Sequence, residues 1–247
     1  ELDAIVPDRA NRAYDMKKVI AAVADGGELF EPHELYAKNM VVAFVRIAGW
    51  PVGVIANNPK FNAGVLDVAA SDKASRFIRF CDAFTIPLVT FTDVPGYMPG
   101  TQQEWAGIIT HGAKLLHAYS EATVPKITVI TRKAYGGAYI AMCSKHLGAD
   151  YVMAWPTAEI AVMGAEGACN IIYRREIASA ADPAAKRAEL VGSYEEQFNN
   201  PYFAAGYGII EEILRPRDTR KRIAALLVAL ADKSEVRLPK KHGNIPL

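Results

Sequence analysis

Apolar and polar residues follow one another in blocks that predict strands and helices in turn. The apolar runs from Met40 to Ala48 and from Val52 to Asn57 flank Gly49-Trp50-Pro51, and this pattern predicts a β-hairpin. Apolar positions then recur at i, i+3, i+4 and i+7, which predicts a helix from about Asp67 to Phe84. A further strand is expected to open at Pro87 with the sequence PLVTFTD.

The same alternation continues along the chain, and it favours an α/β fold. We predict one domain over residues 37–247, preceded by an N-terminal arm and linker helix over residues 1–36. The remaining expected strands are Ile127 to Thr131, YVMAW, EIAVMG and GIIEEIL. The remaining expected helices are Met16 to Val23 capped by Asp15, one opened by the GAEGA turn, Pro183 to about Asn199, and Asp218 to about Ala231.

Charge and composition exclude several classes of partner. With 28 basic and 27 acidic residues the net charge is +1, so nothing indicates nucleic acid or an anionic membrane surface. No apolar run approaches the roughly 18 residues that a membrane span needs. We expect a cytoplasmic protein, or one of the mitochondrial matrix if a transit peptide was removed.

The cysteines and histidines do not suggest a metal site. Cys81, Cys143 and Cys169 lie far apart and form no C-x-x-C pair, so we interpret them as buried free thiols. The five histidines show neither H-E-x-x-H nor H-x-H spacing. Motifs of hydrolase triads (G-x-S-x-G) and of P-loops are also missing from the sequence. We therefore expect no metal and neither of those two chemistries.

A glycine pair after a predicted strand is the first candidate site. In TRKAYGGAY, Gly136 and Gly137 separate the strand from a short helix. The first N–H groups of a helix lack an acceptor and lie at the positive end of its dipole, so the N–H groups of Gly137 and Ala138 could hold an oxyanion. A tight turn that needs small residues for packing explains the same glycines.

Two more glycine-rich turns follow predicted strands. The loop from Asp93 to Glu104 holds Pro95, Gly96 and Gly100, and it could wall a pocket or be a plain surface loop before a helix. In α/β folds, ligands bind at the edge where strands hand over to helices. The third turn contains Gly164, Ala165, Glu166 and Gly167 at a helix start, where Glu166 fits a structural charge better than a catalytic one.

These segments together carry a resemblance. The joint pattern DVPG-x-x-PGT, RKAYGGAY and AWPTAEIAVMG resembles the carboxyltransferase subunits of biotin-dependent acyl-CoA carboxylases, of propionyl-CoA carboxylase type. Transcarboxylases and sodium-pumping decarboxylases have similar subunits. The likeness covers nearly the whole chain but only the C-terminal half of such subunits. It implies a crotonase-like superhelix of ββα units.

The resemblance also implies a reaction and its partners. Biotin is expected as carboxybiotin on a carrier protein of a biotin carboxylase subunit, with an acyl-CoA as acceptor. The N–H groups of Gly137 and Ala138 are expected to stabilise the ureido oxygen of biotin, whose nitrogen takes the α-proton. The implied lining of this pocket comprises Gly136, Tyr139, Ile140 and the two glycine-rich turns just described. The complementary N-terminal half should complete the site, in a dimer or a trimer of dimers.

Two positions depart from the family pattern. Ile140 stands where many propionyl-type members have Asp, and Glu166 stands where Lys is common, which leaves the acyl group undecided. Three other activities stay open: the reverse reaction of a decarboxylase or transcarboxylase, a biotin-binding half that is inactive alone, and a hydratase or isomerase using Glu104 or Glu166.

Overall fold

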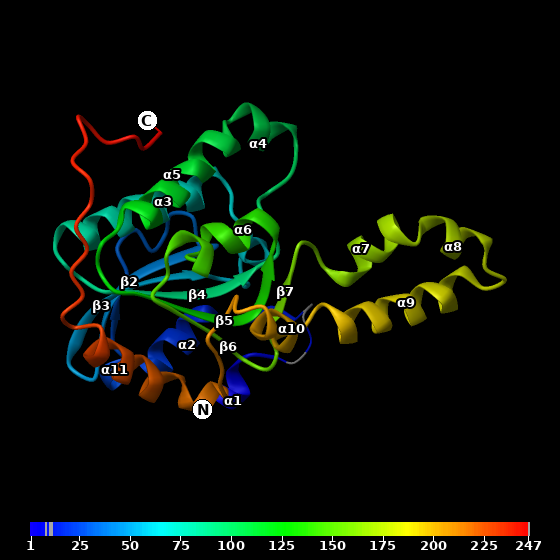
Figure 1. Cartoon of the computed structure of the whole chain (residues 1–247), viewed down its shortest axis with the longest axis horizontal. Coiled ribbons are helices and arrows are strands. Elements are labelled where there is room, and N and C mark those ends of the chain that lie inside the picture. The colour runs from blue at the N-terminus through cyan, green and yellow to red at the C-terminus, as the bar shows by residue number, and fades with distance from the viewer. Residues whose placement is uncertain (8, 10–11, 247) are drawn as a thin grey trace.

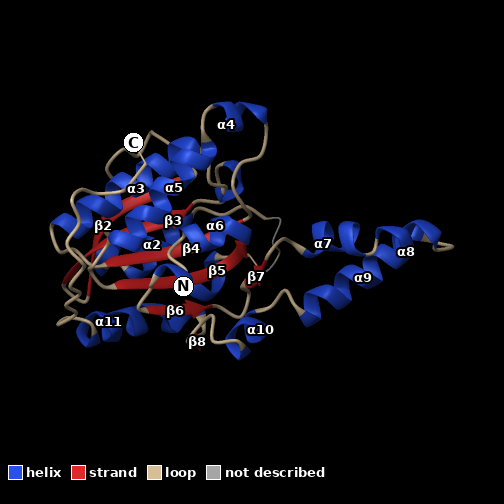
Figure 2. Ribbon diagram, turned by 45° about the horizontal axis from the view of Figure 1, so that its top comes forward, coloured by secondary structure: helices blue, strands red, loops and turns tan. Residues whose placement is uncertain are grey.

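One twisted sheet organises the computed structural model, which describes residues 1–7, 9 and 12–246. The strands run in the order β1-β2-β3-β4-β5-β6-β8, and β7 pairs with the far end of β5 (Figure 2). Their bounds are β1 Leu29–Phe30, β2 Met40–Ile47, β3 Trp50–Asn57, β4 Leu88–Val94, β5 Lys126–Tyr135, β6 Tyr151–Ala154, β7 Glu159–Ala161 and β8 Glu212–Ile213.

Strands β2 and β3 form the predicted hairpin, but its turn is tighter than expected. The antiparallel register pairs Ile47 with Trp50, so only Ala48 and Gly49 form the turn. Both have positive φ angles, 52° and 84°, as a two-residue hairpin turn with the twist of the strands requires. The prediction that Trp50 and Pro51 belong to the turn was therefore wrong, since both lie in β3.

From β3 onward the sheet is parallel, and this brings strand ends to one edge. Strands β3, β4, β5 and β6 pair in parallel, and β4 is buried along its whole length. Parallel strands covered on both faces read as continuous apolar runs, which explains the sequences LVTFTDV and KITVIT. The carboxyl ends of β4 and β5, where two of the glycine-rich turns begin, lie side by side.

Helices cover both faces of the sheet, and one apolar core lies on each side (Figure 1). Helices α3 (Val68–Ala83) and α5 (Ile108–Glu121) cover one face, and α2 (Met16–Val23) and α11 (Thr219–Ala229) cover the other. Side chains of β4 pack into both cores. Leu88 packs into the core on the α3 side, whereas Val89 and Phe91 pack into the core on the α2 side. The remaining helices are α1 Leu2–Ile5, α4 Thr101–Trp105, α6 Gly136–Ala141, α7 Ala165–Ile172, α8 Arg174–Ser179, α9 Pro183–Gln197 and α10 Pro201–Gly206.

The predicted helices are confirmed, as is the Asp15 cap, and the structure shows two further caps at Asp67 and Asp182. The Asp15 carboxylate accepts from Lys17 N at 3.2 Å, and the Asp67 carboxylate accepts from Ala70 N at 2.8 Å. Asp182 caps α9 in the same way. The last two expected strands are shorter than predicted: β7 ends at Ala161, and β8 spans only Glu212 and Ile213.

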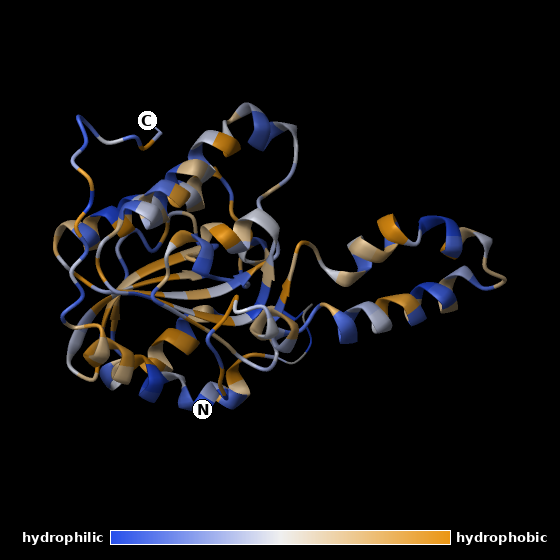
Figure 3. Cartoon of the chain, in the orientation of Figure 1, coloured by the Kyte–Doolittle hydropathy of each residue, from blue (hydrophilic) through white to orange (hydrophobic). Residues whose placement is uncertain are grey.

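Helices α7, α8 and α9 form a helical arm that projects from the body (Figure 1). Helix α7 packs along α9, and apolar and polar residues alternate over both (Figure 3). Ile171 and Ile172 on α7 are 67% and 60% exposed. In the described part of the chain, no helix combines the length and the apolarity that crossing a membrane requires.

Candidate functional site

The glycine pair directly follows the carboxyl end of strand β5. Gly136 has φ of 57°, and a Cβ added there would lie 3.0 Å from Val162 O. Both facts require glycine at this position. Gly137 differs, because a Cβ added to it would meet nothing within 4 Å. The chain therefore turns tightly at Gly136 and leaves open space where a side chain of residue 137 would stand.

The N–H groups of Gly137 and Ala138 lie in the first turn of α6, as predicted. A helix supplies no acceptor to its first N–H groups. Among the described residues, no backbone carbonyl in a turn, loop or cap accepts a hydrogen bond from either N–H group. Gly137 is exposed, whereas Ala138 is only 1% exposed, so a ligand that arrives from solvent meets Gly137 first.

The loop with Pro95, Gly96 and Gly100 leaves the sheet beside this strand, since Val94 pairs with Ala134. Its backbone is bonded to Leu66, just before α3: Leu66 N donates to Gly96 O at 3.0 Å, and Met98 N donates to Leu66 O at 2.8 Å. Tyr97 donates its hydroxyl to Gly112 O of α5 at 3.3 Å, and burial raises the pKa of Tyr97 to about 12. The loop is thus fixed from both sides.

The third glycine-rich turn lies next to the glycine pair. Strand β7 runs parallel to the end of β5, with Ala161 opposite Tyr135. A Cβ added to Gly164 would lie 3.3 Å from the Tyr135 ring, a tight contact, so glycine packs most easily against that ring. Of the predicted residues after Gly164, Ala165 is buried at the start of α7, and Glu166 and Gly167 are exposed.

Glu166 points along the helical arm. Its carboxylate lies 3.4 Å from Arg187 of α9, and its side chain is 79% exposed. The sequence favoured a structural charge at the start of this helix, and the ion pair with Arg187 is a further contact that it did not predict. The other acidic candidate, Glu104, is exposed on α4. Neither carboxylate forms a hydrogen bond with the residues of the Gly136 turn.

A buried ion pair that the sequence did not predict lies between β4 and β5, ahead of the Gly136 turn. Arg132 Nε donates to Asp93 Oδ2 at 3.0 Å, and the two side chains are 1% and 0% exposed. The other Asp93 oxygen accepts from Lys133 N at 3.2 Å. Arg132 also donates to the carbonyl of Arg12, and its guanidinium lies over the Tyr14 ring at 5.0 Å. The only sequence signal was that Asp93 ends one predicted strand and Arg132 directly follows another.

A second tie joins the turn to the base of the helical arm. The Tyr135 hydroxyl donates to the Glu159 carboxylate, which also accepts from Asn199 Nδ2 at 3.3 Å. Burial, aided by Glu159, raises the pKa of Tyr135. Burial likewise raises the pKa of Tyr139, whose hydroxyl has no hydrogen-bond partner among the described residues. Ile140, at 37% exposure, is the apolar neighbour on the same helix.

The structure thus brings together the residues predicted from Gly136 to Ile140 and the start of the third turn at Gly164. The histidines lie elsewhere. His111, for example, bonds Asp72 of α3 at 2.8 Å. Among residues 1–7, 9 and 12–246 no cluster of three His, Cys, Asp or Glu side chains could hold a metal ion.

A family model described as "Carboxyl transferase domain" matches residues 1–245. The chain belongs to the carboxyl transferase domain family. The resemblance inferred from DVPG-x-x-PGT, RKAYGGAY and AWPTAEIAVMG is therefore confirmed. The expectation of the C-terminal half is confirmed too, because this domain spans about half the length of the curated relatives it matches.

Two curated relatives differ in the reaction that their names state. The chain is 58% identical over 247 residues to the carboxyltransferase subunit of propionyl-CoA carboxylase from Haloferax mediterranei. It is also 58% identical over 246 residues to subunit alpha of methylmalonyl-CoA decarboxylase from Veillonella parvula. Each alignment covers 100% of this chain, with 48% of the first relative and 47% of the second.

Among solved structures, the chain is similar to the transcarboxylase 12S hexamer with methylmalonyl-coenzyme A and methylmalonic acid bound. The TM-score is 0.96 at 55% identity, covering 100% of this chain and 47% of that one. The crotonase-like α/β fold expected from the sequence is confirmed by this likeness.

Proposed function

We propose that this domain is the carboxybiotin-facing half of an acyl-CoA carboxyltransferase. It would move a carboxyl group between biotin on a carrier protein and the α-carbon of a short-chain acyl-CoA. Membership of the carboxyl transferase domain family supports this, as do relatives named for propionyl-CoA and methylmalonyl-CoA. The observation that carries the proposal is the pair of N–H groups at Gly137 and Ala138 in the first turn of α6, with open space where a Gly137 side chain would stand.

The residues at the turn fit a urea carbonyl. Such a carbonyl is a flat acceptor that needs N–H donors and close approach to a backbone. Gly137 offers both, because it has no side chain in the way and its N–H, in the first turn of α6, donates to no turn or loop carbonyl of the described residues. When bound, carboxybiotin supplies a urea nitrogen that carries the carboxyl group and releases it.

The contribution of this chain is electrostatic. The N–H groups of Gly137 and Ala138 donate to the oxygen on which negative charge develops, and the positive end of α6 adds to them. They are held in place by the chain before the reaction, so they need no reorganisation. One such donor is worth about 3 kcal/mol of transition-state stabilisation in a hydrolase. No side-chain base is required from this chain.

The walls of the pocket would come from the surrounding turns. The loop holding Pro95, Gly96 and Gly100 would form one side, and residues 164–167 would form the other. Tyr139 and Ile140 follow the donors on α6, and the apolar Ile140 would favour an acyl chain over a polar group. These residues would orient substrates and exclude water, while the complementary N-terminal half would supply most contacts to coenzyme A.

The opposite direction is the second candidate. A decarboxylase subunit is as similar to this chain as a carboxylase subunit, at 58% identity each. The same two amides serve either direction, since both pass through the same charged oxygen. The partner subunits would set the direction. The partners proposed are the biotin carrier with its carboxylase subunit, the N-terminal half, and further copies of the same chain.

Isotope transfer from labelled methylmalonyl-CoA or malonyl-CoA to free biotin tests the proposal. The domain is mixed with the complementary N-terminal half of a close relative, and each half alone is the control. We expect transfer only from the mixture and only with biotin present. Saturable biotin binding without transfer in the mixture would indicate a binding module. Hydration of an enoyl-CoA without biotin would instead support a hydratase, and either result contradicts carboxyl transfer.

A further inference from the structure

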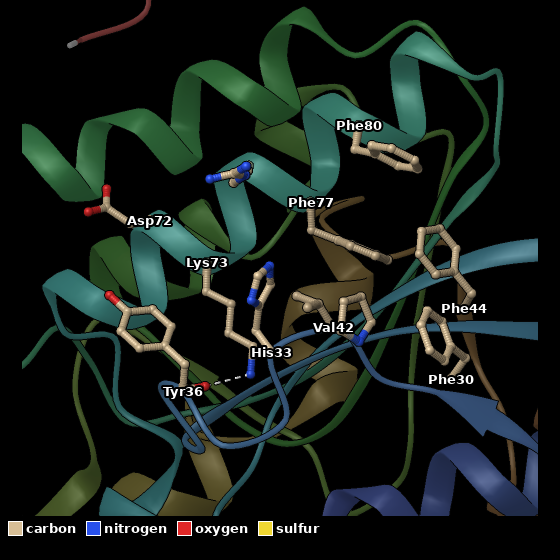
Figure 4. A pocket seen from close by; sticks show the side chains of 11 residues that line it. Phe30, His33, Tyr36, Val42, Phe44, Asp72, Lys73, Phe77 and Phe80 are labelled. Carbon is tan, nitrogen blue, oxygen red and sulfur yellow. Dashed lines mark hydrogen bonds between the residues drawn. The ribbon is translucent and has the colours of Figure 1, made fainter.

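A cavity of about 540 Å³ lies between α3, β2 and the segment that follows β1 (Figure 4). It borders the β1–β2 end of the sheet, whereas the Gly136 turn follows β5, with β3 and β4 between them. None of the residues predicted for carboxyl transfer lines it. Eleven residues do: Phe30, Pro32, His33, Tyr36, Val42, Phe44, Asp72, Lys73, Arg76, Phe77 and Phe80.

One wall of the cavity is aromatic. Phe44 lies at its centre, with ring centroids 4.8 Å from Phe77, 5.8 Å from Phe80 and 6.3 Å from Phe30. Figure 4 shows these four rings gathered at one end. Phe30 and Phe80 remain 68% and 47% exposed. An apolar chain inserted here would cover apolar surface that now faces water, which favours binding.

The polar part of the lining includes two basic side chains of α3, Lys73 and Arg76, and the charge of Arg76 is not neutralised by a described neighbour. The ammonium group of Lys73 is already bonded within the chain. Its Nζ donates to the carbonyls of Tyr36 and Met40 at 2.8 and 2.7 Å and lies 3.6 Å from Glu31. Arg76, in contrast, is exposed and forms no hydrogen bond or ion pair with any residue that the structure describes.

The acidic group of the lining is already paired. Asp72 accepts from His111 at 2.8 Å and lies 3.2 Å from Lys114 Nζ. It therefore does not balance the charge of Arg76. His33 adds a ring that points into the cavity between Lys73 and Val42 (Figure 4). The electrostatic preference near Arg76 is for an anion.

We propose that this cavity is a binding site for an anionic amphiphile, with an apolar chain among the phenylalanines and a carboxylate or phosphate at Arg76. The volume lies within the usual range of small-molecule sites, and the combination of an apolar lining with a few convergent polar groups is typical of them. A free fatty acid and an acyl-CoA share this chemistry. The cavity does not include the amides at Gly137 and Ala138. If no ligand binds in the cavity, the proposed carboxyltransferase function is unaffected.

Calorimetric titration of the full 247-residue chain with octanoate and octylamine tests this inference. The two probes carry the same tail with opposite charge. We expect saturable binding of octanoate and much weaker binding of octylamine. Arg76→Gln should weaken octanoate binding by about tenfold, because a charge-assisted hydrogen bond is lost. Phe80→Ala should weaken it to a similar extent by removing apolar contact.

Matched controls are available on the same elements. Arg79→Gln removes an exposed cation one turn further along α3, and Leu35→Ala removes an 82% exposed apolar side chain beside the lining residues. Both should bind octanoate as the parent chain does. A titration with octanoyl-CoA shows which class of ligand the cavity prefers. If octanoyl-CoA binds more tightly than octanoate and Phe80→Ala weakens its binding, the ligand is an acyl-CoA. If octanoyl-CoA binds more weakly than octanoate, the ligand is a free fatty acid.

Three results would overturn the proposal. The first is the absence of saturable octanoate binding below its micelle concentration. The second is equal binding of octylamine. The third is self-association, seen by sedimentation without any ligand, that Phe80→Ala abolishes but Leu35→Ala does not. That last result would make the aromatic wall a contact between protein chains.

Discussion

Asp93 and Arg132 form an ion pair that water does not reach. Their side chains are 0% and 1% exposed, and Nε lies 3.0 Å from Oδ2. Asp93 belongs to β4 and Arg132 to β5, each a few residues before a glycine-rich turn of the candidate site. Arg132 also bonds the carbonyl of Arg12 ahead of α2. The pair therefore fixes two strand ends and the incoming N-terminal segment at one point.

Removing one member of this pair should be strongly destabilising. Arg132→Met leaves the Asp93 carboxylate buried without its cation, which costs about 3–5 kcal/mol of unfolding free energy. Urea unfolding followed by circular dichroism measures the change. Arg46→Met, at an exposed position on β2, is the control and should be nearly neutral. The double variant Asp93→Asn with Arg132→Met should recover part of the loss. Equal stability of Arg132→Met and Arg46→Met would contradict this role.

The N–H group of Gly137 can be removed without a side-chain deletion. Gly137→Pro lacks the donor, and proline is tolerated in the first turn of a helix. Gly137→Ala keeps the donor and adds a Cβ into open space, so its effect reports crowding alone. We expect the proline variant to lose about 100-fold in the rate of carboxyl transfer relative to the alanine variant. Equal rates in two folded variants would rule out a donor role for this amide.

Asp25 gives the stability of the chain a defined pH dependence. Its carboxylate accepts from Ala48 N and Gly49 N in the hairpin turn at 2.9 and 2.7 Å, and from Arg220 of α11. The Arg220 hydrogen bond, with those of the hairpin amides, holds the pKa of Asp25 below its ordinary value of 3.8. A lowered carboxyl pKa adds stability above the unfolded pKa and loses it as the pH falls through the folded one.

Asp25→Asn should therefore lower the melting temperature at pH 7 but have a shrinking effect from roughly pH 5 to pH 2. Melting curves of both proteins across this range measure the difference. Glu28→Gln is the comparison, because Glu28 lies close to Asp25 in the sequence and accepts no hydrogen bond from either residue of the hairpin turn. A difference that stays constant with pH would show that the charge of Asp25 does not matter.

The thiols of Cys81 and Cys143 should be inert in the folded protein. Both are fully buried, and burial raises the pKa of each to about 12. The thiolate is the reactive form, so at pH 8 almost none is present. We expect no labelling of either residue by a maleimide until denaturant is added, read by mass spectrometry of peptides. Rapid labelling of Cys143 in the native state would show that the core between β5 and α6 opens.

The sequence predicts most of the fold because the periodic signals are strong. The buried stripe of α3 and the Asp67 cap specify that helix almost to the residue. The hairpin turn was misplaced because Pro51 suggested a loop, although proline is allowed at the start of a strand. Strand β8 was overestimated since an apolar run does not reveal how long its neighbour is. Its partner β6 has only four residues, and only Met153 and Ala154 pair with it.

The candidate site was only partly predictable. Glycines that follow a strand are visible in a sequence, so the turns at Gly136 and Gly164 were found. The Asp93–Arg132 pair was not, because two charged residues 39 positions apart give no local signal until the register of β4 and β5 is known. The aromatic cavity was missed for the same reason. Phe30, Phe44 and Phe80 come from three separate elements.

The helical arm has a consequence for engineering the chain. It leaves the body after β7 and returns at α10, and the Asn199 amide bonds Glu159 of β7 at the point of return. Its entry and exit are thus held together by a link that does not involve α7, α8 or α9. A short flexible linker could replace residues 170–197 while the described strands keep their order and residues 164–167 stay in place, so a foreign peptide could be inserted at this position.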